Sequence, residues 1–282
     1  MPELPEVETV RRGLERQTRG LRIEKVQVLR ASTIASPEFP EYFCKALEKT
    51  TLVHWTRRGK YLLASLRGPQ GSPAGSWGVH LRMTGQFLWL ENSQPPCRHT
   101  RVRLWNREGE ELRFVDVRSF AQMWWVAPNV DVNDVITGLR KLGPEPFSDQ
   151  FHANYLQHRL RGSRRPIKNA LLDQSLVAGV GNIYADEALF RAGILPYTIS
   201  GSLKKSRLER LRLALVDVLE ASIGAGGTTF RDFRDLKGTN GNYGGLAWVY
   251  GRGGQPCRRC GTVIRRDKLA GRSCHWCNRC QS

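Results

Sequence analysis

The sequence predicts an α+β protein with an N-terminal antiparallel β-sandwich behind one helix, then a helical part and a small C-terminal module. Three observations support this. Short runs of alternating polarity fill residues 21–126, helical spacing takes over after about Asp131, and five of the seven cysteines follow residue 256. We therefore expect domains at 1–130, 131–247 and 248–282, and the chain is long enough for the larger two to bury cores.

The first part begins with a predicted helix. Val7, Val10 and Leu14 recur at helical spacing after Pro5, and Gly20 can end the helix. Alternating segments then predict strands over 23–28, 60–66, 101–105, 112–117 and 121–126. The segment 67–76 is rich in glycine, proline and serine and predicts a flexible surface loop.

The second part is predicted to be helical over 151–160, 167–174, 183–192 and 203–223. The last of these places five apolar residues on one stripe: Leu208, Leu211, Leu215, Val218 and Leu219. Four residues, 224–227, should end it because three of them are glycine. The segment 237–245 is too glycine-dense for a helix or a buried strand, and we expect a mobile loop there.

The charge favours nucleic acid as the partner. The net charge is +18, and 34 of the 44 basic residues are arginine, whose planar fork matches phosphate. The alternative is a basic protein from a GC-rich genome. No apolar run approaches the ~18 residues of a membrane helix. The acidic start lacks the apolar stretch of a secretory signal, so we expect a cytoplasmic protein.

The cysteine tail predicts a metal site. Cys257 and Cys260, then Cys277 and Cys280, form two Cys-x-x-Cys pairs at the spacing typical of tetrahedral zinc. Four thiolates leave no open position for water, so such an ion is structural. A disulfide staple is the alternative. The register is also open, because Cys274 and Cys277 form a third possible pair.

Two features of the basic background predict phosphate contacts. Residues 250–282 hold eight basic residues and one acidic residue, and we expect Arg272 at a rigid hairpin turn, in contact with DNA or solvated. Gly179 and Gly181 precede Asn182, a good cap for a helix from Ile183, and exposed N–H groups there bind anions. Lys168 lies one helix upstream. An ordinary helix–turn–helix corner is the alternative.

The N-terminus offers a nucleophile. Removal of Met1 would leave the secondary amine of Pro2 free, next to Glu3 and close to Glu6. An α-amino group has a lower pKa than lysine, so more of it is nucleophilic at neutral pH, and its attack on an acetal-like carbon gives a Schiff base. The alternative is that Pro2 and Glu3 only start a helix.

Taken together, these motifs resemble the bacterial formamidopyrimidine-DNA glycosylase family (8-oxoguanine DNA glycosylase/AP lyase) along the whole chain. The resemblance rests on Met1-Pro-Glu-Leu-Pro-Glu-Val-Glu-Thr9, Arg57-Arg-Gly-Lys-Tyr61, His80-Leu-Arg-Met-Thr-Gly85, Asp116-Val-Arg-Ser-Phe120, Ile167-Lys-Asn-Ala-Leu-Leu-Asp-Gln174, Val177-Ala-Gly-Val-Gly-Asn-Ile-Tyr184 and Tyr250-Gly-Arg252 with the cysteines. It implies a helix-two-turn-helix domain, a β-hairpin zinc finger with one structural Zn²⁺, and Cys280 as the fourth ligand.

The resemblance also implies catalytic roles. Pro2 would attack C1′ of the damaged nucleotide, Glu3 would serve as acid and base, and Lys60 would bind a phosphate beside the lesion. Glu6 would contribute to the lesion pocket. Asn182 and Arg272 would grip flanking phosphates with help from Lys168, and Arg272 is counted with the catalytic set.

Further DNA contacts follow from the same resemblance. Met83 and Phe120 would fill the gap left by the flipped nucleotide, Arg118 would bind the orphaned cytosine, and His99 would contact DNA. Residues around 237–245 would close over the base. Without the resemblance, Met83 and Phe120 would be assigned to the core.

The implied enzyme excises oxidised purines from duplex DNA and cuts at abasic sites by β,δ-elimination. It would be a monomeric, cytoplasmic, nucleoid-associated bacterial protein without membrane contact or nucleotide cofactor. The chain departs from the family pattern at Ala121, Cys274, Asn278, the 67–77 loop and 243–245, where a glutamine is missing. Three rival hypotheses are the endonuclease VIII branch, which acts on oxidised pyrimidines, a non-catalytic zinc-dependent DNA-binding protein, and an RNA-binding protein.

Overall fold

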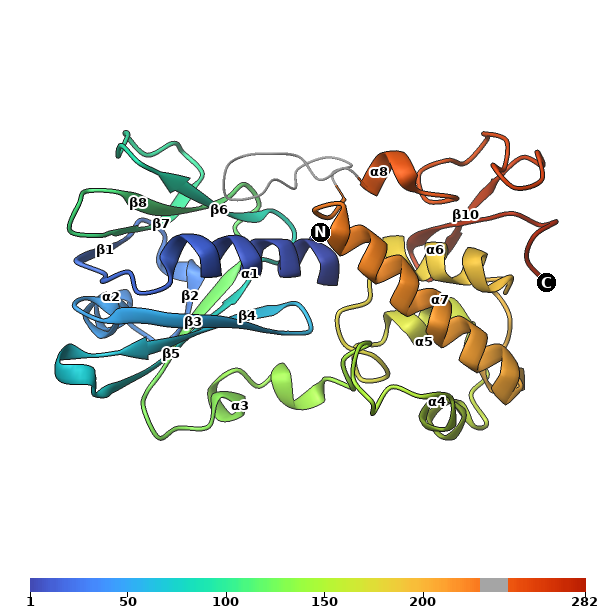
Figure 1. Ribbon diagram of the computed structural model, residues 1–282, viewed down its shortest axis with the longest axis horizontal. Coiled ribbons are helices and arrows are strands. Elements are labelled where there is room, and N and C mark those ends of the chain that lie inside the picture. The colour runs from blue at the N-terminus through green and yellow to red at the C-terminus, as the bar shows by residue number, and fades with distance from the viewer. Residues whose placement is uncertain (229–242) are drawn as a thin grey trace. The chain divides into compact units, whose positions relative to one another are not determined.

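The computed structural model describes residues 1–228 and 243–282, which form two compact units (Figure 1). One unit comprises Met1–Arg140 together with the segment that starts at Gly226, and the other comprises Lys141–Ala225 together with the C-terminal residues. Among the described residues, no helix is long and apolar enough to cross a membrane.

The first unit begins with helix α1 (Leu4–Thr18), as the apolar spacing predicts. Pro5 lies in its first turn, where proline costs no hydrogen bond, and the Glu3 N–H donates to the Glu6 carboxylate at 2.8 Å. Val7, Val10 and Leu14 are buried on its inner face, and α1 packs against strand β3 (Thr51–Arg58). The start of the chain is thereby fixed to the first unit.

Nine strands of the first unit form two sheets around one apolar core. A four-stranded sheet has the order β1-β7-β8-β6, and a five-stranded sheet has the order β2-β9-β5-β4-β3. Trp55 and Trp77 from the second sheet pack edge-on against Phe87 from the first. The remaining strands are β1 (Lys25–Val28), β2 (Ile34–Ser36), β4 (Tyr61–Arg67), β5 (Pro73–His80), β6 (Gly85–Leu90), β7 (Thr100–Trp105), β8 (Glu111–Asp116) and β9 (Gln122–Val126).

The β-sandwich is confirmed, with three differences in detail. The pairing of β2 with β9 is parallel, so one sheet is not purely antiparallel. Helix α2 (Pro40–Leu47) was not predicted and buries Phe43 and Leu47. The short helix α3 (Val132–Val135) follows the sandwich, capped by the Asp131 side chain.

The prediction of a loop over 67–76 is wrong at both ends. Arg67 closes β4, and β5 already starts at Pro73. Gly75 has φ +85°, and a Cβ there would lie 2.0 Å from the Val126 carbonyl oxygen, so glycine permits the close approach of β9. Gly75, which contributed to the loop prediction, therefore allows β5 to pair with β9.

The second unit is helical, as predicted. Its helices are α4 (Ala153–Leu160), α5 (Ile167–Leu172), α6 (Asn182–Ala192), α7 (Lys205–Gly224) and the short α8 (Tyr243–Leu246). Helix α7 buries the predicted stripe of Leu208, Leu211, Leu215, Val218 and Leu219 and packs against α6. It ends at Gly224, where the glycines begin.

The glycine-rich segment 237–245 is only partly within the described residues. Residues 237–242 lie outside them, so the prediction of a mobile loop stays untested there. Residues 243–245 belong to α8, so that part of the prediction is wrong. Tyr243 is buried, with its ring centroid 5.9 Å from that of Tyr184, and this contact accounts for the helical turn.

The chain ends in a β-hairpin module. Strands β10 (Arg265–Leu269) and β11 (Arg272–Trp276) are antiparallel, and Leu269 is paired with Arg272 across the turn. Ala270 and Gly271 both have positive φ, as a tight two-residue hairpin requires. Arg272 is therefore the first residue of β11 beside the turn, and it is exposed.

Candidate functional site

Pro2 lies at the start of α1 with two carboxyl side chains close to it in sequence and in space. Pro2, Glu3 and Glu6 are buried, whereas Met1 is exposed. One oxygen of Glu6 accepts the Glu3 N–H, and the other accepts the N–H of Thr228 at 2.8 Å. The segment after α7 therefore contributes directly to the surroundings of Pro2.

Lys60 lies in the turn between β3 and β4, beside Gly59, whose φ is +56°. Arg57 fixes this turn to α1, because its Nε donates to Glu8 at 3.1 Å and its Nη1 donates to the Gly59 carbonyl at 3.0 Å. Burial alone would raise the pKa of Glu8, but hydrogen bonds from Arg11 and Arg12 and the charges of Arg11 and Arg57 lower it. The ion pair between Arg57 and Glu8 thus connects the turn that contains Lys60 to helix α1, which follows Pro2.

His80 is a residue that sequence reasoning missed as a site candidate, although it opens a recognised motif. Its Nδ1 accepts the Arg82 N–H at 3.0 Å, and its ring packs against Tyr61. Burial, with the charges of Arg82 and Lys60, lowers the pKa of His80 to about 3. The ring is therefore neutral at physiological pH, with the proton on Nε2.

Four of the predicted DNA contacts of the first unit lie at the ends of β6, β7 and β8. Met83 precedes β6, His99 precedes β7, and Arg118 and Phe120 follow β8. The Arg118 guanidinium lies 4.8 Å from the Phe120 ring centre, and the Phe120 side chain is 53% exposed. An exposed phenylalanine beside an arginine suits contact with bases better than core packing.

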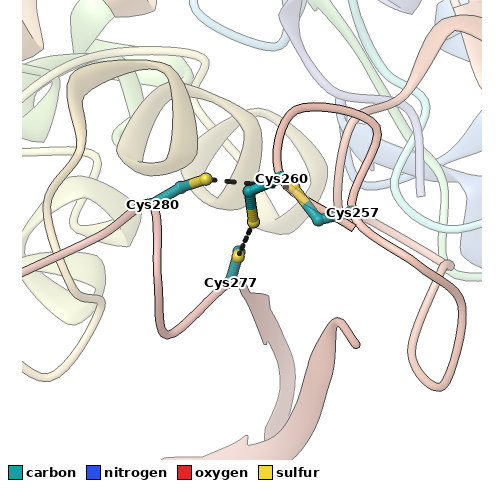
Figure 2. A group of neighbouring side chains, drawn as sticks. All are labelled: Cys257, Cys260, Cys277 and Cys280. Carbon is teal, nitrogen blue, oxygen red and sulfur yellow. Dashed lines mark hydrogen bonds between the residues drawn. The ribbon is translucent and has the colours of Figure 1, made fainter. Parts of the chain in front are cut away.

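The four predicted zinc ligands converge at one point (Figure 2). The sulfur atoms of Cys257, Cys260, Cys277 and Cys280 all lie within 4.8 Å of one another, with 3.5 Å between Cys260 and Cys277. Thiolates about 2.3 Å from one zinc ion lie about 3.8 Å apart at tetrahedral corners. The cysteines therefore fit one tetrahedral ion with no open position.

Cys274 is not part of this cluster, which resolves the register. It is buried on β11, opposite Asp267 of β10. Burial and the charge of Asp186 raise the pKa of Cys274 to about 12, so it is a neutral thiol. Cys280 completes the metal site instead.

Lys168 is fully buried and bound within the second unit. Its Nζ lies 2.6 Å from Asp186 Oδ1 and donates to the Ser273 carbonyl at 2.6 Å. Asp186 Oδ2 accepts the His275 N–H at 2.9 Å and lies 3.1 Å from the His275 ring nitrogen. The ion pair therefore fastens β11 to α5 and α6.

Asn182 shares the same carbonyl. Its Nδ2 donates to Ser273 O at 3.0 Å, so Asn182 and Lys168 converge on the residue next to Arg272. The prediction that Asn182 caps α6 is wrong, because the helix begins at Asn182 and Gly181 is its N-cap. The side chain contacts β11 rather than the helix terminus.

Glu187 was also missed from sequence. It is buried in α6 and accepts the N–H groups of Trp248, Val249 and Tyr250 at 2.8 to 2.9 Å. Burial raises the pKa of Glu187, and these three hydrogen bonds act in the opposite direction. Asp186 and Glu187 thus hold two separate segments of the C-terminal module, and two adjacent acids in a helical pattern gave no signal of this.

Comparison with protein families identifies three matching models. Residues 1–123 match the formamidopyrimidine-DNA glycosylase N-terminal domain, residues 142–234 match its H2TH domain, and residues 254–282 match the zinc finger found in FPG and IleRS. Proteins named formamidopyrimidine-DNA glycosylase are 63% identical in Parasynechococcus marenigrum, over the whole of both chains, and 65% identical in a Synechococcus strain, over 100% and 99% of them.

Solved structures agree. The chain superposes on a Lactococcus lactis FPG variant in complex with a Fapy-dG containing DNA with a TM-score of 0.89 and 33% identity over the whole of both chains. The L. lactis Fpg complex with an abasic site containing DNA gives a TM-score of 0.89 and 33% identity over 99% of each chain. A complex of the same wild-type protein with an oxidised pyrimidine containing DNA gives 0.88, again with 33% identity over both full chains.

Proposed function

Because this chain belongs to the formamidopyrimidine-DNA glycosylase family, we propose that it excises oxidised bases from duplex DNA through the amine of Pro2. It is a bifunctional DNA glycosylase and AP lyase. The observation that carries the assignment of Pro2 is its position: it is buried at the start of α1, beside Glu3 and Glu6. We assign catalysis to residues 1–130, DNA binding to 131–247 and the metal module to 248–282.

The reaction starts when Met1 has been removed. The Pro2 nitrogen attacks C1′, the glycosidic bond breaks, and the base leaves with the bonding electron pair and takes up the proton that the Pro2 nitrogen loses. Glu3 donates the proton that opens the sugar ring, which yields an iminium between Pro2 and C1′. The iminium acidifies the proton on C2′, so β-elimination expels the 3′ phosphate, and δ-elimination then expels the 5′ phosphate.

Lys60, Asn182 and Arg272 bind phosphates beside the lesion in this proposal. The support for Lys60 is its place in a turn fastened to α1 through Arg57 and Glu8. The support for Asn182 is its hydrogen bond to the Ser273 carbonyl, and the support for Arg272 is its exposed position beside the hairpin turn, next to Ser273. Lys168 assists from beneath, through the Ser273 carbonyl, because its own side chain is fully buried.

The remaining DNA contacts compensate for base flipping, which costs a few kcal/mol. Met83 and Phe120 fill the vacated space, Arg118 binds the orphaned base, and His99 contacts the duplex. Glu6 borders the lesion pocket, supported by its hydrogen bond to Thr228. The substrates are 8-oxoguanine opposite cytosine, formamidopyrimidines and abasic sites, in keeping with the DNA complexes of the L. lactis protein.

One zinc ion held by the four cysteines supplies structure rather than chemistry, because it keeps β10 and β11 in place. The enzyme works as a monomer on nucleoid DNA in the bacterial cytoplasm; the bacterial relatives support this setting. A non-catalytic DNA-binding protein would retain every phosphate contact, so only covalent chemistry separates it from the enzyme.

Borohydride trapping tests the proposal. The trimmed protein is incubated with an 8-oxoguanine duplex and sodium borohydride, which reduces the iminium to a stable amine. We expect a protein–DNA adduct on the N-terminal peptide by mass spectrometry, and we expect none with Glu3→Gln at early times. The matched control is the same chain with Met1 retained, in which Pro2 is an amide. Absence of adduct from the trimmed, metal-loaded protein contradicts the enzyme.

A further inference from the structure

Two turns of the first unit carry the residues that we place in the gap left by the flipped nucleotide. Met83 lies in the turn before β6, and Arg118 and Phe120 lie in the turn after β8. Each turn contains a non-glycine residue with positive φ, +50° at Arg82 and +57° at Ser119. Such conformations are uncommon and persist only where surrounding contacts hold them.

The carboxylate of Asp116 binds residues of both turns. It accepts the Ala121 N–H on Oδ2 at 2.8 Å, and on Oδ1 it accepts the Thr84 hydroxyl at 2.5 Å and the Arg118 N–H at 3.2 Å. The Thr84 oxygen in turn accepts the same Arg118 N–H at 3.0 Å. One side chain therefore closes the turn from 117 to 121 and ties it to the residue after Met83.

The backbone of Asp116 extends the arrangement to the fourth DNA contact. Its N–H donates to the His99 carbonyl at 2.9 Å, and its own carbonyl accepts from Arg101 Nε at 2.9 Å. The residue is only 1% exposed, and its bonds to Ala121 and Arg101 are buried away from competing water. Each of the four proposed DNA contacts at this end of the sandwich is thus bonded to Asp116 through its backbone or is next in the chain to a residue that Asp116 binds.

We propose that Asp116 is the positioning residue for the gap-filling surface and thereby determines discrimination of the opposite base. The inference rests on the proposed function, and it assigns Asp116 no contact with DNA or with the reacting atoms. Loss of the carboxylate removes three hydrogen bonds that hold the two turns and, among the described residues, leaves only the bond from the Arg118 N–H to the Thr84 oxygen between them. Met83 and Phe120 then insert less well, and Arg118 binds the orphaned base more weakly. The rate of the chemical steps at Pro2 is not affected.

Two pairs of variants test this. Asp116→Asn keeps the size but presents an amide NH₂ to N–H and O–H donors, and Asp116→Glu keeps the charge at a different length. Thr84→Val removes only the hydroxyl that links the turns, and Thr84→Ser retains it as the matched control. Thermal melting and zinc content are measured for each variant to show that it folds. If Asp116→Asn does not fold, Thr84→Val tests the proposal in its place.

Activity is compared on three substrates under single-turnover conditions: 8-oxoguanine opposite cytosine, 8-oxoguanine opposite adenine, and a single-stranded abasic oligonucleotide. We expect Asp116→Asn to cleave the cytosine duplex at least about tenfold more slowly, with a smaller cytosine-to-adenine ratio. Cleavage of the single-stranded substrate, which has no opposite base, stays within about twofold. The cleavage rate and the cytosine-to-adenine ratio of Thr84→Val should lie between those of Asp116→Asn and the wild type, and those of Thr84→Ser should equal the wild-type values.

Retained discrimination in Asp116→Asn and Thr84→Val overturns the proposal, and so does an equal loss on all three substrates, because a general structural role predicts it. Hydrogen exchange provides a readout independent of activity: amides of 81–85 and 117–121 should exchange faster in Asp116→Asn, and unchanged exchange also overturns the proposal. If the wild-type protein cleaves none of the substrates, the proposed function is contradicted. Hydrogen exchange then still tests whether Asp116 holds the two turns.

Discussion

Lys168 and Asp186 form an ion pair with 2.6 Å between Nζ and Oδ1, and both side chains are 0% exposed. Removal of one partner leaves an uncompensated buried charge, at a cost of about 3–5 kcal/mol. Lys168→Met should therefore lower the melting temperature strongly. The double variant Lys168→Met/Asp186→Asn, which removes both charges, should recover part of the loss.

The same variants separate stability from phosphate binding. In our assignment Lys168 acts through Ser273, so DNA affinity of the double variant should keep the wild-type dependence on salt concentration. A direct phosphate contact predicts a slope smaller by about 0.9. Fluorescence anisotropy with labelled duplex at several salt concentrations measures the slope, and a reduced slope would mean that Lys168 reaches the DNA itself.

Zinc content should depend on Cys280 and not on Cys274. Cys280→Ser removes one corner of the sulfur cluster, whereas Cys274 lies outside it as a neutral thiol. We expect close to one zinc per chain in the wild type and in Cys274→Ser, and a clear deficit in Cys280→Ser, by plasma mass spectrometry. The opposite pattern would restore the rejected register.

Glu187 should stabilise the second unit without contact to metal or DNA. Glu187→Ala leaves three N–H groups without their acceptor, of which that of Val249 is buried, at about 1–3 kcal/mol for each that water does not reach. We expect a melting temperature lower by several degrees. Glu220→Gln is the control, because Glu220 is exposed on α7 and such substitutions stay within about 0.5 kcal/mol. Equal behaviour of the two variants would contradict the anchoring role.

His80 should not titrate between pH 5 and 8. Its pKa in the folded state is about 3, whereas the unfolded chain has the ordinary value near 6.5. The unfolded state therefore binds more protons below pH 6.5, and His80 lowers stability progressively as the pH falls from about 6.5 to 3. The pH dependence of the histidine ring NMR shifts shows whether His80 titrates. The pH dependence of the free energy of unfolding gives a second check, because His80→Gln should lose less stability than the wild type between pH 6.5 and 4.5.

Local sequence signals predicted much of the fold. The apolar stripe of α7, the alternating strands and the cysteine pairs each depend on neighbours within a few residues, and each is confirmed. The errors arose where distant contacts override local preference. Gly75 permits the close approach of β9, and Tyr243 packs on Tyr184, so residues 73–76 and 243–245 of the two glycine-rich segments lie in a strand and a helix.

Sequence motifs indicated the candidate site residues but not the side chains that hold them in place. Pro2, Lys60 and the cysteines belong to recognisable motifs, yet nothing local marks Asp186 or Glu187 as anchors, because the C-terminal backbone groups that they bind lie more than 60 residues away. Asn182 was mispredicted for the same reason, because its side-chain amide donates to the distant Ser273 carbonyl and does not cap its own helix. Long-range hydrogen bonds between polar side chains leave no periodic trace in a sequence.

The bond from Thr228 to Glu6 has a practical consequence for anyone who divides this gene. A fragment that stops at codon 140 encodes both sheets and Pro2, our proposed nucleophile, but it lacks the amide that binds the nearby Glu6. Transplanting the N-terminal half alone into a chimera would therefore leave the Glu6 carboxylate without this hydrogen bond. The later piece of polypeptide would have to be supplied with it, as a tethered or co-expressed peptide.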